Sequence, residues 1–412
     1  MGVKTPLMSH KHPLLSAALV VAALGYFVDV YDLVLFLVVK NPSLREMGVP
    51  AELMLETGTV LLNWQMFGML LGGVIWGILG DRIGRTKVLF GSILIYSVAN
   101  IANACISSIP LYAALRFIAG IGLAGELGAG VTLVAEILPQ RLRGYGTTIV
   151  AGVGVFGAIA AGLTGDLVSW RTSYIVGGVL GLLLLALRVS VSESHLFNAV
   201  KEREHTTKDI LLLLASRTRF VRYLMCMILG IPIWYIIGIL LANANDLARA
   251  LGVTDVPKAG YCIAFCYSGL LIGDIVGGLL SQRLQSRKRP IAIFLMLTLV
   301  APLWFLTREG LSLSGFYCNY VLLGIAGGYW VLVVTTAAEQ FGTNVRATVT
   351  TTVPNFIRGA IVPVSEGFLL LKPTFGLINA ALFMGIFVSF LATISLFWLR
   401  ETFHRDLDFV EE

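Results

Sequence analysis

Long apolar stretches separated by short polar segments run along the whole chain of 412 residues. A helix needs about 20 apolar residues to cross the hydrocarbon core of a bilayer. Stretches of about this length recur, and they predict membrane-spanning helices at 14–39, 57–79, 88–106, 109–137, 146–168, 171–190, 218–242, 258–281, 290–307, 314–337, 347–370 and 374–399. The pattern therefore predicts an all-α membrane protein with twelve transmembrane helices.

The composition supports this interpretation. Hydrophobic residues make up 57% of the chain and charged residues only 13%, whereas a soluble domain carries about 25% charged residues. So few charges could not cover the surface of a soluble protein of this length. The composition excludes a soluble enzyme or a disordered chain, and it predicts that much of the apolar surface faces lipid.

The basic residues predict the orientation of the chain in the membrane. If the amino terminus lies inside, 21 of the 30 Lys and Arg residues fall on the cytoplasmic side and seven on the other. Such a bias is the usual signal for cytoplasmic loops. We therefore expect both termini in the cytoplasm of a multi-pass protein of a bacterial inner membrane. The net charge of +6 then reflects topology, and no nucleic-acid partner is expected.

The longest polar stretch lies near the middle of the chain, at residues 190–217. It is expected to be a cytoplasmic linker. The predicted organisation is an amino-terminal six-helix bundle over residues 1–189 and a carboxy-terminal six-helix bundle, with a short cytoplasmic tail, over residues 218–412.

The two predicted halves are related by an internal repeat. Residues 77–87 read GILGDRIGRTK and residues 278–288 read GLLSQRLQSRK, an offset of 201 positions. An Ala-Glu pair followed by six residues and Arg occurs at 135–143 and again at 338–346, an offset of 203. Because each half holds an even number of spans, the repeats are parallel. Transporters with two such halves bind substrate between them, near the middle of the membrane.

Several of these motifs resemble those of the major facilitator superfamily. The segment 80–85 is similar to the signature loop between the second and third helices of that family, and 116–122 is similar to its Arg-Gly motif on the fourth helix. Ser192-Glu193-Ser194, Arg400-Glu401-Thr402 and the two Glu-x6-Arg pairs resemble motifs of its metabolite:proton symporter and sugar-porter branches. The resemblance implies secondary active transport by alternating access. The 218–242 span lacks the Gln-rich sugar signature, and the 146–168 span lacks the Gly-Pro motif of drug antiporters.

The charged loops at the predicted cytoplasmic ends are candidate gating elements. Arg82 and Arg85 can bridge to Glu136 or Glu339 with paired hydrogen bonds. Such contacts would latch the two halves together while the cytoplasmic side is closed. A cluster that only sets topology is the alternative. The candidate gating residues are Asp81, Arg82, Gly84, Arg85, Glu136, Arg143, Glu339 and Arg346.

A few charges fall inside the predicted spans, where each costs at least ~2.5 kcal/mol. Asp29 and Asp32 lie three residues apart and so share a face of one helix. Two carboxylates that close cannot comfortably both ionise, which suits a proton-binding site. Arg116 and Glu126 supply a possible countercharge and a third acid. The alternative is a structural ion pair. Asp274 and Glu366 are expected to be structural or to lie at the edge of a cavity.

Arg358, with Asn355 one turn earlier, is the candidate for binding an anionic substrate. The guanidinium fork suits a carboxylate or a phosphate, although Arg358 could equally pair with an acid of the protein. Amide and aromatic side chains inside spans can complete a mixed pocket, but Trp and Tyr are also common at membrane interfaces. The further substrate-binding candidates are Tyr26, Asn63, Gln65, Trp234, Tyr235, Tyr329 and Trp330.

These features predict a proton-coupled symporter of a small organic metabolite that is anionic or zwitterionic. A proton-driven antiporter exporting metabolites, siderophores or drugs is the alternative within transport, and a membrane sensor that transports nothing is the alternative of another class. The expected partners are the substrate, protons and the bilayer, and the chain is expected to act as a monomer. No catalytic residues, no cofactor and no metal are expected, because no nucleotide-binding motif is present and Cys262 and Cys266 have no His or carboxylate beside them.

Overall fold

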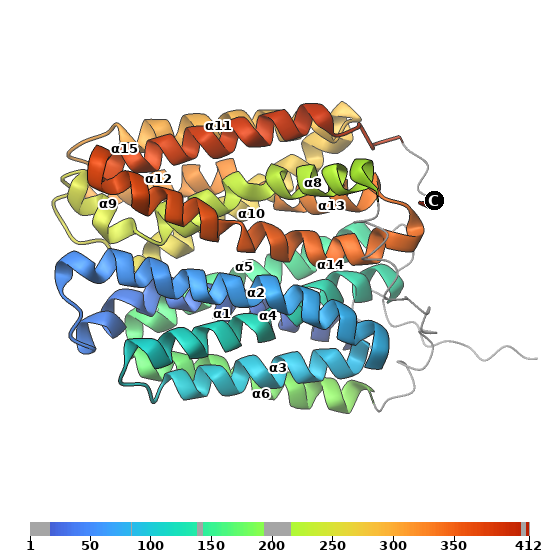
Figure 1. Cartoon of the computed structure of the whole chain (residues 1–412), viewed down its shortest axis with the longest axis horizontal. Coiled ribbons are helices and arrows are strands. Elements are labelled where there is room, and N and C mark those ends of the chain that lie inside the picture. Colours follow the sequence, from blue (N-terminus) through green and yellow to red (C-terminus); the bar gives the residue numbers. More distant parts are fainter. Residues whose placement is uncertain (1–16, 84, 138–142, 193–215, 405–408, 412) are drawn as a thin grey trace, which may run out of the picture.

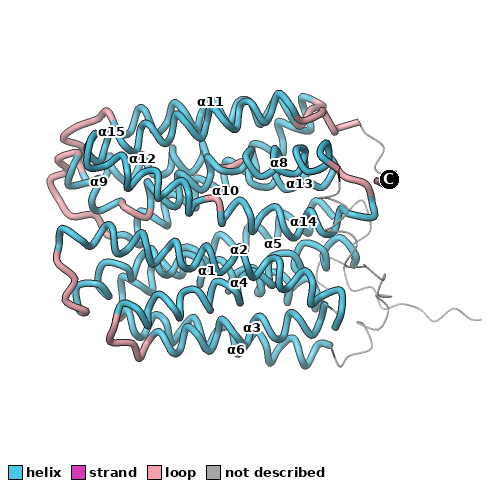
Figure 2. The backbone as a smooth tube through the Cα atoms, in the orientation of Figure 1, coloured by secondary structure: helices cyan, strands magenta, loops and turns pink. Residues whose placement is uncertain are grey.

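The computed structural model describes residues 17–83, 85–137, 143–192, 216–404 and 409–411, with the side chains of 17–18, 80–86, 127–148, 151, 190–192, 343–344 and 347 left out. Long helices run side by side along one direction (Figure 1). The described residues contain no strand, and short loops join the helices at both ends of the bundle (Figure 2). The all-α prediction is confirmed.

The first half of the chain forms the lower group of blue-to-green helices in Figure 1. Its helices are α1 (Ala17–Glu46), α2 (Met54–Ile83), α3 (Arg85–Asn103), α4 (Ile109–Ile137), α5 (Arg143–Leu167) and α6 (Trp170–Ser192), with a short 3-10 turn, η2 (Ala51–Leu53), before α2. Within this half α1 packs on α5, and α4 packs on both α2 and α3.

The second half forms the upper group, coloured from yellow-green to red. It contains α8 (Arg217–Tyr235), the π-helical turn η3 (Ile236–Leu241), α9 (Ala244–Ala250), α10 (Ala259–Leu284), α11 (Lys288–Leu306), α12 (Leu313–Gly327), α13 (Trp330–Gln340), α14 (Thr343–Gly359) and α15 (Ile361–Trp398). Here α10 packs on α12, and α15 packs on α8 and α11.

The described helices account for the twelve predicted spans. Nine stretches are long and apolar enough to cross a membrane, and Lys87–Asn103 and Gly152–Leu167 are shorter apolar helices. One of the nine, Thr348–Trp398, bends back on itself at Gly376, where φ is 76°, and so supplies two spans. The fold prediction is therefore confirmed.

Helix breaks in the second half occur where polar side chains or prolines interrupt the backbone hydrogen bonds of the helix. α8 gives way to the π-helical turn η3 shortly after Pro232, and α14 ends just before Pro363. The break between α12 and α13 was not predicted from a proline. It is supported by Asp274 of α10, whose Oδ1 accepts a hydrogen bond from the backbone N–H of Val331 at 3.1 Å. Asp274 thus has the structural role expected for it.

The two halves meet along a few helices. α5 contacts α10, and α14 contacts α2 and α4. Many large apolar side chains are exposed on the outside of the bundle, among them Leu167, Leu370 and Phe397. Exposed apolar surface of this extent belongs against lipid. The buried charged side chains described below lie inside the bundle.

Candidate functional site

The two acidic residues of α1 lie at the centre of the candidate site. Asp29 and Asp32 are both fully buried. A guanidinium Nη2 of Arg358, at the end of α14, lies 3.5 Å from Oδ2 of Asp29. The pair connects two positions separated by 329 residues, one in each half. The sequence left two roles for Arg358, binding an anionic substrate or pairing with an acid of the protein. In this conformation Arg358 pairs with an acid of the protein.

This ion pair leaves much hydrogen-bonding capacity unused. Among the described residues, Oδ1 of Asp29 and the Nε and Nη1 atoms of Arg358 have no hydrogen-bond partner, although all three are buried. Both carboxylate oxygens of Asp32 are also buried without a partner. Unpaired buried polar atoms are costly. Such atoms at the contact between the halves are a place where a ligand and a proton can bind.

Arg116 is held by neutral groups of the first half. Its Nη2 donates to Oδ1 of Asn100 at 2.5 Å, and its Nη1 lies 3.5 Å from Oε1 of Gln65. The guanidinium carbon lies 4.8 Å from the centre of the Tyr174 ring, within the range of a cation–π contact. Asp32 and Arg116 are thus on neighbouring helices, α1 and α4, but the described contacts of Arg116 are to amides and an aromatic ring.

Glu126 pairs with a residue that was not among the candidates. It forms a salt bridge with Arg188 of α6, in which both terminal guanidinium nitrogens donate to the carboxylate. Both side chains are buried. Arg188 lies near the end of the predicted 171–190 span, where a single basic residue gives no sequence signal that it is a buried partner.

Lys40 lies just outside the predicted 14–39 span, and the structure places it inside a helix. It belongs to α1 and is buried. Its Nζ donates to the backbone oxygen of Ala242 at 2.6 Å and to Oδ1 of Asn243 at 3.1 Å, where η3 meets α9. Its aliphatic stem packs on Gly58 of α2, where any side chain would overlap it. Lys40 therefore joins the first half to the second, and we call this end of the bundle the Lys40 end.

Asn63 also joins the two halves. Its Nδ2 donates to Oε1 of Glu366 at 2.7 Å, and its Oδ1 accepts a hydrogen bond from the hydroxyl of Ser365 at 2.6 Å. Asn63 is on α2, and both partners are on α15. This substrate-binding candidate is thus engaged in closing the bundle in this conformation.

The remaining substrate-binding candidates differ in whether their polar atoms are already hydrogen-bonded within the protein. The hydroxyls of Tyr235 and Tyr329 donate to the backbone oxygens of Ala381 and Leu229, at 2.8 and 3.2 Å. Asn355 donates through Nδ2 to the backbone oxygen of Ala124 at 3.0 Å. Tyr26 and Trp330 are half-buried.

Trp234 is the exception among these candidates. Its indole Nε1 is buried without a partner among the described residues. Its ring centre lies 5.8 Å from the guanidinium carbon of Arg358.

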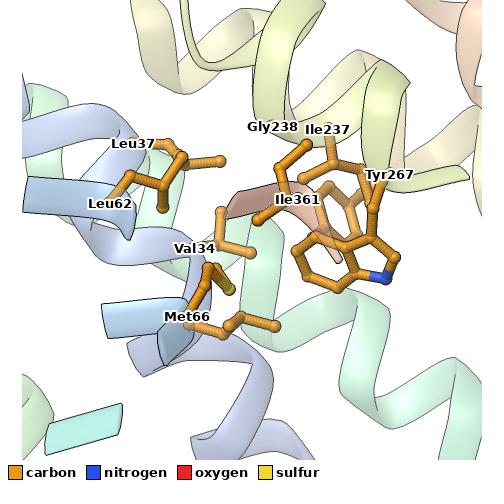
Figure 3. A pocket seen from close by; sticks show the side chains of 10 residues that line it. Val34, Leu37, Leu62, Met66, Ile237, Gly238, Tyr267 and Ile361 are labelled. Carbon is orange, nitrogen blue, oxygen red and sulfur yellow. The ribbon is translucent and has the colours of Figure 1, made fainter. Parts of the chain in front are cut away.

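A narrow apolar pocket lies between the halves, next to these residues. Val34 and Leu37 of α1 and Leu62 and Met66 of α2 face the second half, where Ile237 of η3, Tyr267 of α10 and Ile361 of α15 line the other side (Figure 3). The space enclosed has no room for a water molecule. This conformation is therefore closed around the candidate site.

A family model described as Major Facilitator Superfamily matches residues 16–363. The chain belongs to this superfamily. It is a secondary transporter of a small molecule and a multi-pass membrane protein, not an enzyme, since the family and its relatives are transporters.

The relatives of this superfamily member are metabolite transporters. A predicted metabolite transport protein of Haemophilus influenzae is 28% identical over 397 residues, covering 92% of this chain and 95% of that protein. The sialic acid transporter NanX of Escherichia coli K12 is 26% identical over 322 residues, covering 75% and 76%. The crystal structure of a D-xylose-proton symporter superimposes with a TM-score of 0.67 at 16% identity, covering 91% of this chain and 96% of the other. That similarity confirms the fold.

The candidate gating residues of this superfamily member are only partly described. The side chains of Asp81, Arg82, Arg85, Glu136 and Arg143, and the whole of Gly84, lie outside the described part of the chain.

The two gating candidates in the second half are described. Glu339 is bonded through its two oxygens to Arg287, at 2.8 and 3.1 Å, and accepts a hydrogen bond from the hydroxyl of Thr402 at 2.7 Å. Arg346 donates to the backbone oxygens of Ala338 and Phe341. The described partners of Glu339 are thus in its own half.

Glu401 completes this cluster in the second half. Burial raises the pKa of its carboxyl, but the hydroxyl of Ser286 and the backbone N–H groups of Arg287, Lys288 and Phe403 donate to it. These hydrogen bonds outweigh burial and lower the pKa of Glu401 from 4.5 to about 2. The carboxylate is therefore ionised at neutral pH and holds the turn before α11 against the end of α15.

Proposed function

We propose that this protein is a symporter that moves a small organic anion together with a proton by alternating access. The observation that carries the proposal is the buried pair of Asp29 and Arg358, one residue from each half, with donors and an acceptor left unused. A substrate carboxylate needs the same guanidinium that Asp29 now contacts.

The competition for Arg358 couples the anion to the proton. When a substrate carboxylate binds the fork of Arg358, Asp29 loses its cation. A buried carboxylate without a countercharge is strongly disfavoured, so Asp29 takes up a proton. The net charge of the site is then the same with and without substrate, and one proton accompanies one anion.

Asp32 is the second residue on the path of this proton. Its two oxygens are buried without hydrogen-bond partners among the described residues. Asp29 and Asp32 share a face of α1, so the proton taken up with the substrate can pass from one to the other. Arg116 lies on the neighbouring helix α4 and favours the ionised state when the proton leaves.

The comparisons support an anionic substrate and proton coupling without extending to this chain by themselves. Sialic acid, the substrate in the name of one relative, is a carboxylic acid. The solved structure with the same fold is a proton symporter by its title.

Alternating access requires that the two halves rock about the site. Residues 1–189 and 218–412 are the proposed rocking units, joined by the linker at 190–217. Lys40 and Asn63 close the Lys40 end, which by the charge distribution is the outer side. Both termini are then cytoplasmic, in a bacterial inner membrane. Because both halves of one chain supply the site, a monomer suffices.

Transport by purified protein in liposomes tests the proposal. With an inward proton gradient, labelled carboxylates offered outside should accumulate. Asp29→Asn and Asp32→Asn should each abolish accumulation, because neither amide can release a proton. Accumulation that survives both substitutions together would exclude the carboxylate mechanism. Efflux against an inward proton gradient would indicate the antiporter, and no flux of any carboxylate would favour the sensor.

The role of Arg358 is tested in the same system. Arg358→Lys keeps the charge but loses the planar fork, so we expect substrate affinity to fall by about tenfold or more while thermal stability changes little. Arg171→Lys is the matched control, because Arg171 contacts Glu46 at the protein surface, at 3.0 Å, and should change neither. Unchanged affinity in Arg358→Lys would remove Arg358 from the binding site.

A further inference from the structure

We propose that the substrate is a monocarboxylate with an apolar, ring-sized body, bound by Arg358 and Trp234 at its carboxylate and by the apolar pocket at its body. This inference rests on the proposed function and assigns the chemical class of the anion. It is carried by the pocket between the halves and by the donors that border it.

The pocket is apolar on both sides. Figure 3 shows aliphatic side chains of the first half, including Val34, Leu62 and Met66, facing Ile237 and Ile361 of the second half. No Asn, Gln, Ser, Thr or charged side chain of the described residues lines the pocket. When the halves move apart, this surface becomes the wall of the cavity. Such a wall binds an apolar body and offers little to a chain of hydroxyl groups.

Trp234 connects the pocket to the anion-binding arginine. It lines the pocket, and its ring centre lies 5.8 Å from the guanidinium carbon of Arg358. Its Nε1 and the Nε and Nη1 of Arg358 are buried donors without partners among the described residues. Trp234 thus lies between the apolar surface and the guanidinium of Arg358, and a carboxylate bound beside it would accept from these donors. A flat ring attached to that carboxylate would lie against the indole and the aliphatic wall.

Few amide atoms near the site remain for a sugar. Asn63 is bonded through both of its amide atoms to Glu366 and Ser365. Asn355 donates to the backbone of Ala124 and Gln65 accepts from Arg116, so of these three amides only Oδ1 of Asn355 and Nε2 of Gln65 lack partners among the described residues, and neither residue lines the pocket. A polyhydroxylated substrate has to replace its hydrogen bonds with water by equivalent bonds in the site, and two amide atoms are too few for that purpose.

The number of available cations limits the substrate to one negative charge. Lys40 is held by the backbone of Ala242, and Arg116 donates to Asn100 and keeps only its Nε without a partner. Arg358 has two unused donors, Nε and Nη1, and is the cation beside Trp234 of the pocket. A second carboxylate on the substrate would be buried without a countercharge, at high cost.

Equilibrium binding to the full-length protein in detergent, without any gradient, tests this assignment by calorimetry. The probes are benzoate, its neutral isostere benzamide, the dianion phthalate and the polyhydroxylated acid gluconate. We expect benzoate to bind about tenfold or more tightly than each of the other three. Gluconate or phthalate binding as tightly as benzoate, or no binding of benzoate, would overturn the assignment.

Three variants locate the bound benzoate. Trp234→Phe keeps the ring but removes the N–H, and should weaken benzoate binding about fivefold. Leu62→Asn should weaken it about tenfold by making the pocket wall polar. Val60→Thr is the matched control, because Val60 is exposed on another face of α2 and does not line the pocket, and it should leave binding within about twofold. Equal affinity in Leu62→Asn and Val60→Thr would place benzoate elsewhere.

Failure here is distinguishable from failure of the proposed function. If gluconate accumulates under a proton gradient and this accumulation is lost in Asp29→Asn, proton-coupled transport holds and the substrate class is wrong. If benzoate binds with the expected preferences but never accumulates, the substrate class holds and proton coupling fails.

Discussion

At the scale of single residues, the charges inside this membrane protein divide into two kinds. Glu126 and Arg188 pair within the first half through both carboxylate oxygens, and only Nε of Arg188 is left without a partner. Asp29, Asp32 and Arg358 leave carboxylate oxygens and guanidinium donors without partners. A closely paired acid and base contribute to stability, whereas charges with several unused polar atoms are available for function. This difference gives the two groups opposite behaviour on substitution.

Removing one member of the Glu126–Arg188 pair should lower stability mainly because the other member is left buried without a partner. Glu126→Gln leaves Arg188 buried without its countercharge, so we expect a loss of about 2–4 kcal/mol in the free energy of unfolding. The double variant Glu126→Gln/Arg188→Met should recover at least half of this loss, because no unpaired charge remains. Thermal and chemical unfolding in detergent measure both. A double variant no more stable than Glu126→Gln alone would show that the pair is not the source of the effect.

The sequence could predict which charges lie within the apolar spans but not which of them pair. Asp29, Asp32 and Arg358 stand out in apolar surroundings, and their importance was predicted for that reason. Their contact was not, because Arg358 lies 329 positions away from Asp29 and no local pattern encodes so distant a contact. Lys40 lies one residue beyond the predicted 14–39 span and Arg188 near the end of the 171–190 span, so neither stood out as a buried charge.

At the scale of elements, helix lengths were predictable and helix breaks only partly so. The number of apolar residues needed to cross the bilayer fixes the spans within a few positions. Pro232 and Pro363 mark two breaks in the second half. The break before α13 depends on Asp274, a residue of α10, which supplies the acceptor for a freed backbone N–H. Because the stabilising residue belongs to another helix, the sequence around the break does not reveal it.

The junction of η3 and α9 contacts α1 and so helps to close the Lys40 end of the bundle. The carbonyl end of a helix favours a cation, and Lys40 donates there to Ala242 and Asn243. Lys40→Met keeps the aliphatic stem and removes these bonds. We expect this variant to open the Lys40 end. Spin labels at the exposed positions Glu52 and Asp255 should then show longer distances by electron paramagnetic resonance.

A surface ion pair at the same end supplies the control for this measurement. Lys372 contacts Glu56 at 3.4 Å, but Glu56 is exposed and Lys372 is partly exposed, and such pairs contribute little. Lys372→Met should therefore leave the distance distribution unchanged. The exposed cysteines Cys105 and Cys318 are replaced by serine before labelling. The same distribution in Lys40→Met and Lys372→Met would contradict a closing role for Lys40.

At the scale of the whole molecule, the two halves touch closely where α5 crosses α10. The backbone of Gly162 lies so near that of Gly260 that a Cβ added to Gly162 would be 2.7 Å from the carbonyl oxygen of Gly260. Small residues allow such backbone contact between membrane helices. Because the halves must move relative to each other in every transport cycle, this crossing has to slide or pivot.

A side chain at this crossing should slow transport more than it reduces stability. We expect Gly162→Ala to lower the rate of substrate exchange across liposomes by about tenfold, because the methyl group forces α5 and α10 apart. Gly152→Ala is the matched control on the same helix, since no atom of the described residues lies within 4 Å of a Cβ there. Equal exchange rates in the two variants would show that the crossing does not limit the motion.

The arrangement of the halves was predictable from the repeat, and the closed state was not. Two motif matches at nearly one offset imply two parallel halves, and the superfamily match agrees. Which side is closed depends on contacts such as those of Lys40 and Asn63, which join positions far apart in the chain. The gating cluster of the first half lies outside the described side chains, so its predicted contacts stay predictions.

The most direct test of proton-coupled anion transport follows protons and not substrate. Liposomes containing the purified protein and an internal pH-sensitive dye, with no gradient imposed and the membrane potential clamped, receive an external organic anion. Symport predicts acidification of the interior that follows uptake of the anion and disappears in Asp29→Asn. Uptake without a pH change, alkalinisation of the interior, or acidification that persists in Asp29→Asn beyond that of protein-free liposomes would contradict the competition of proton and substrate at Asp29 and Arg358.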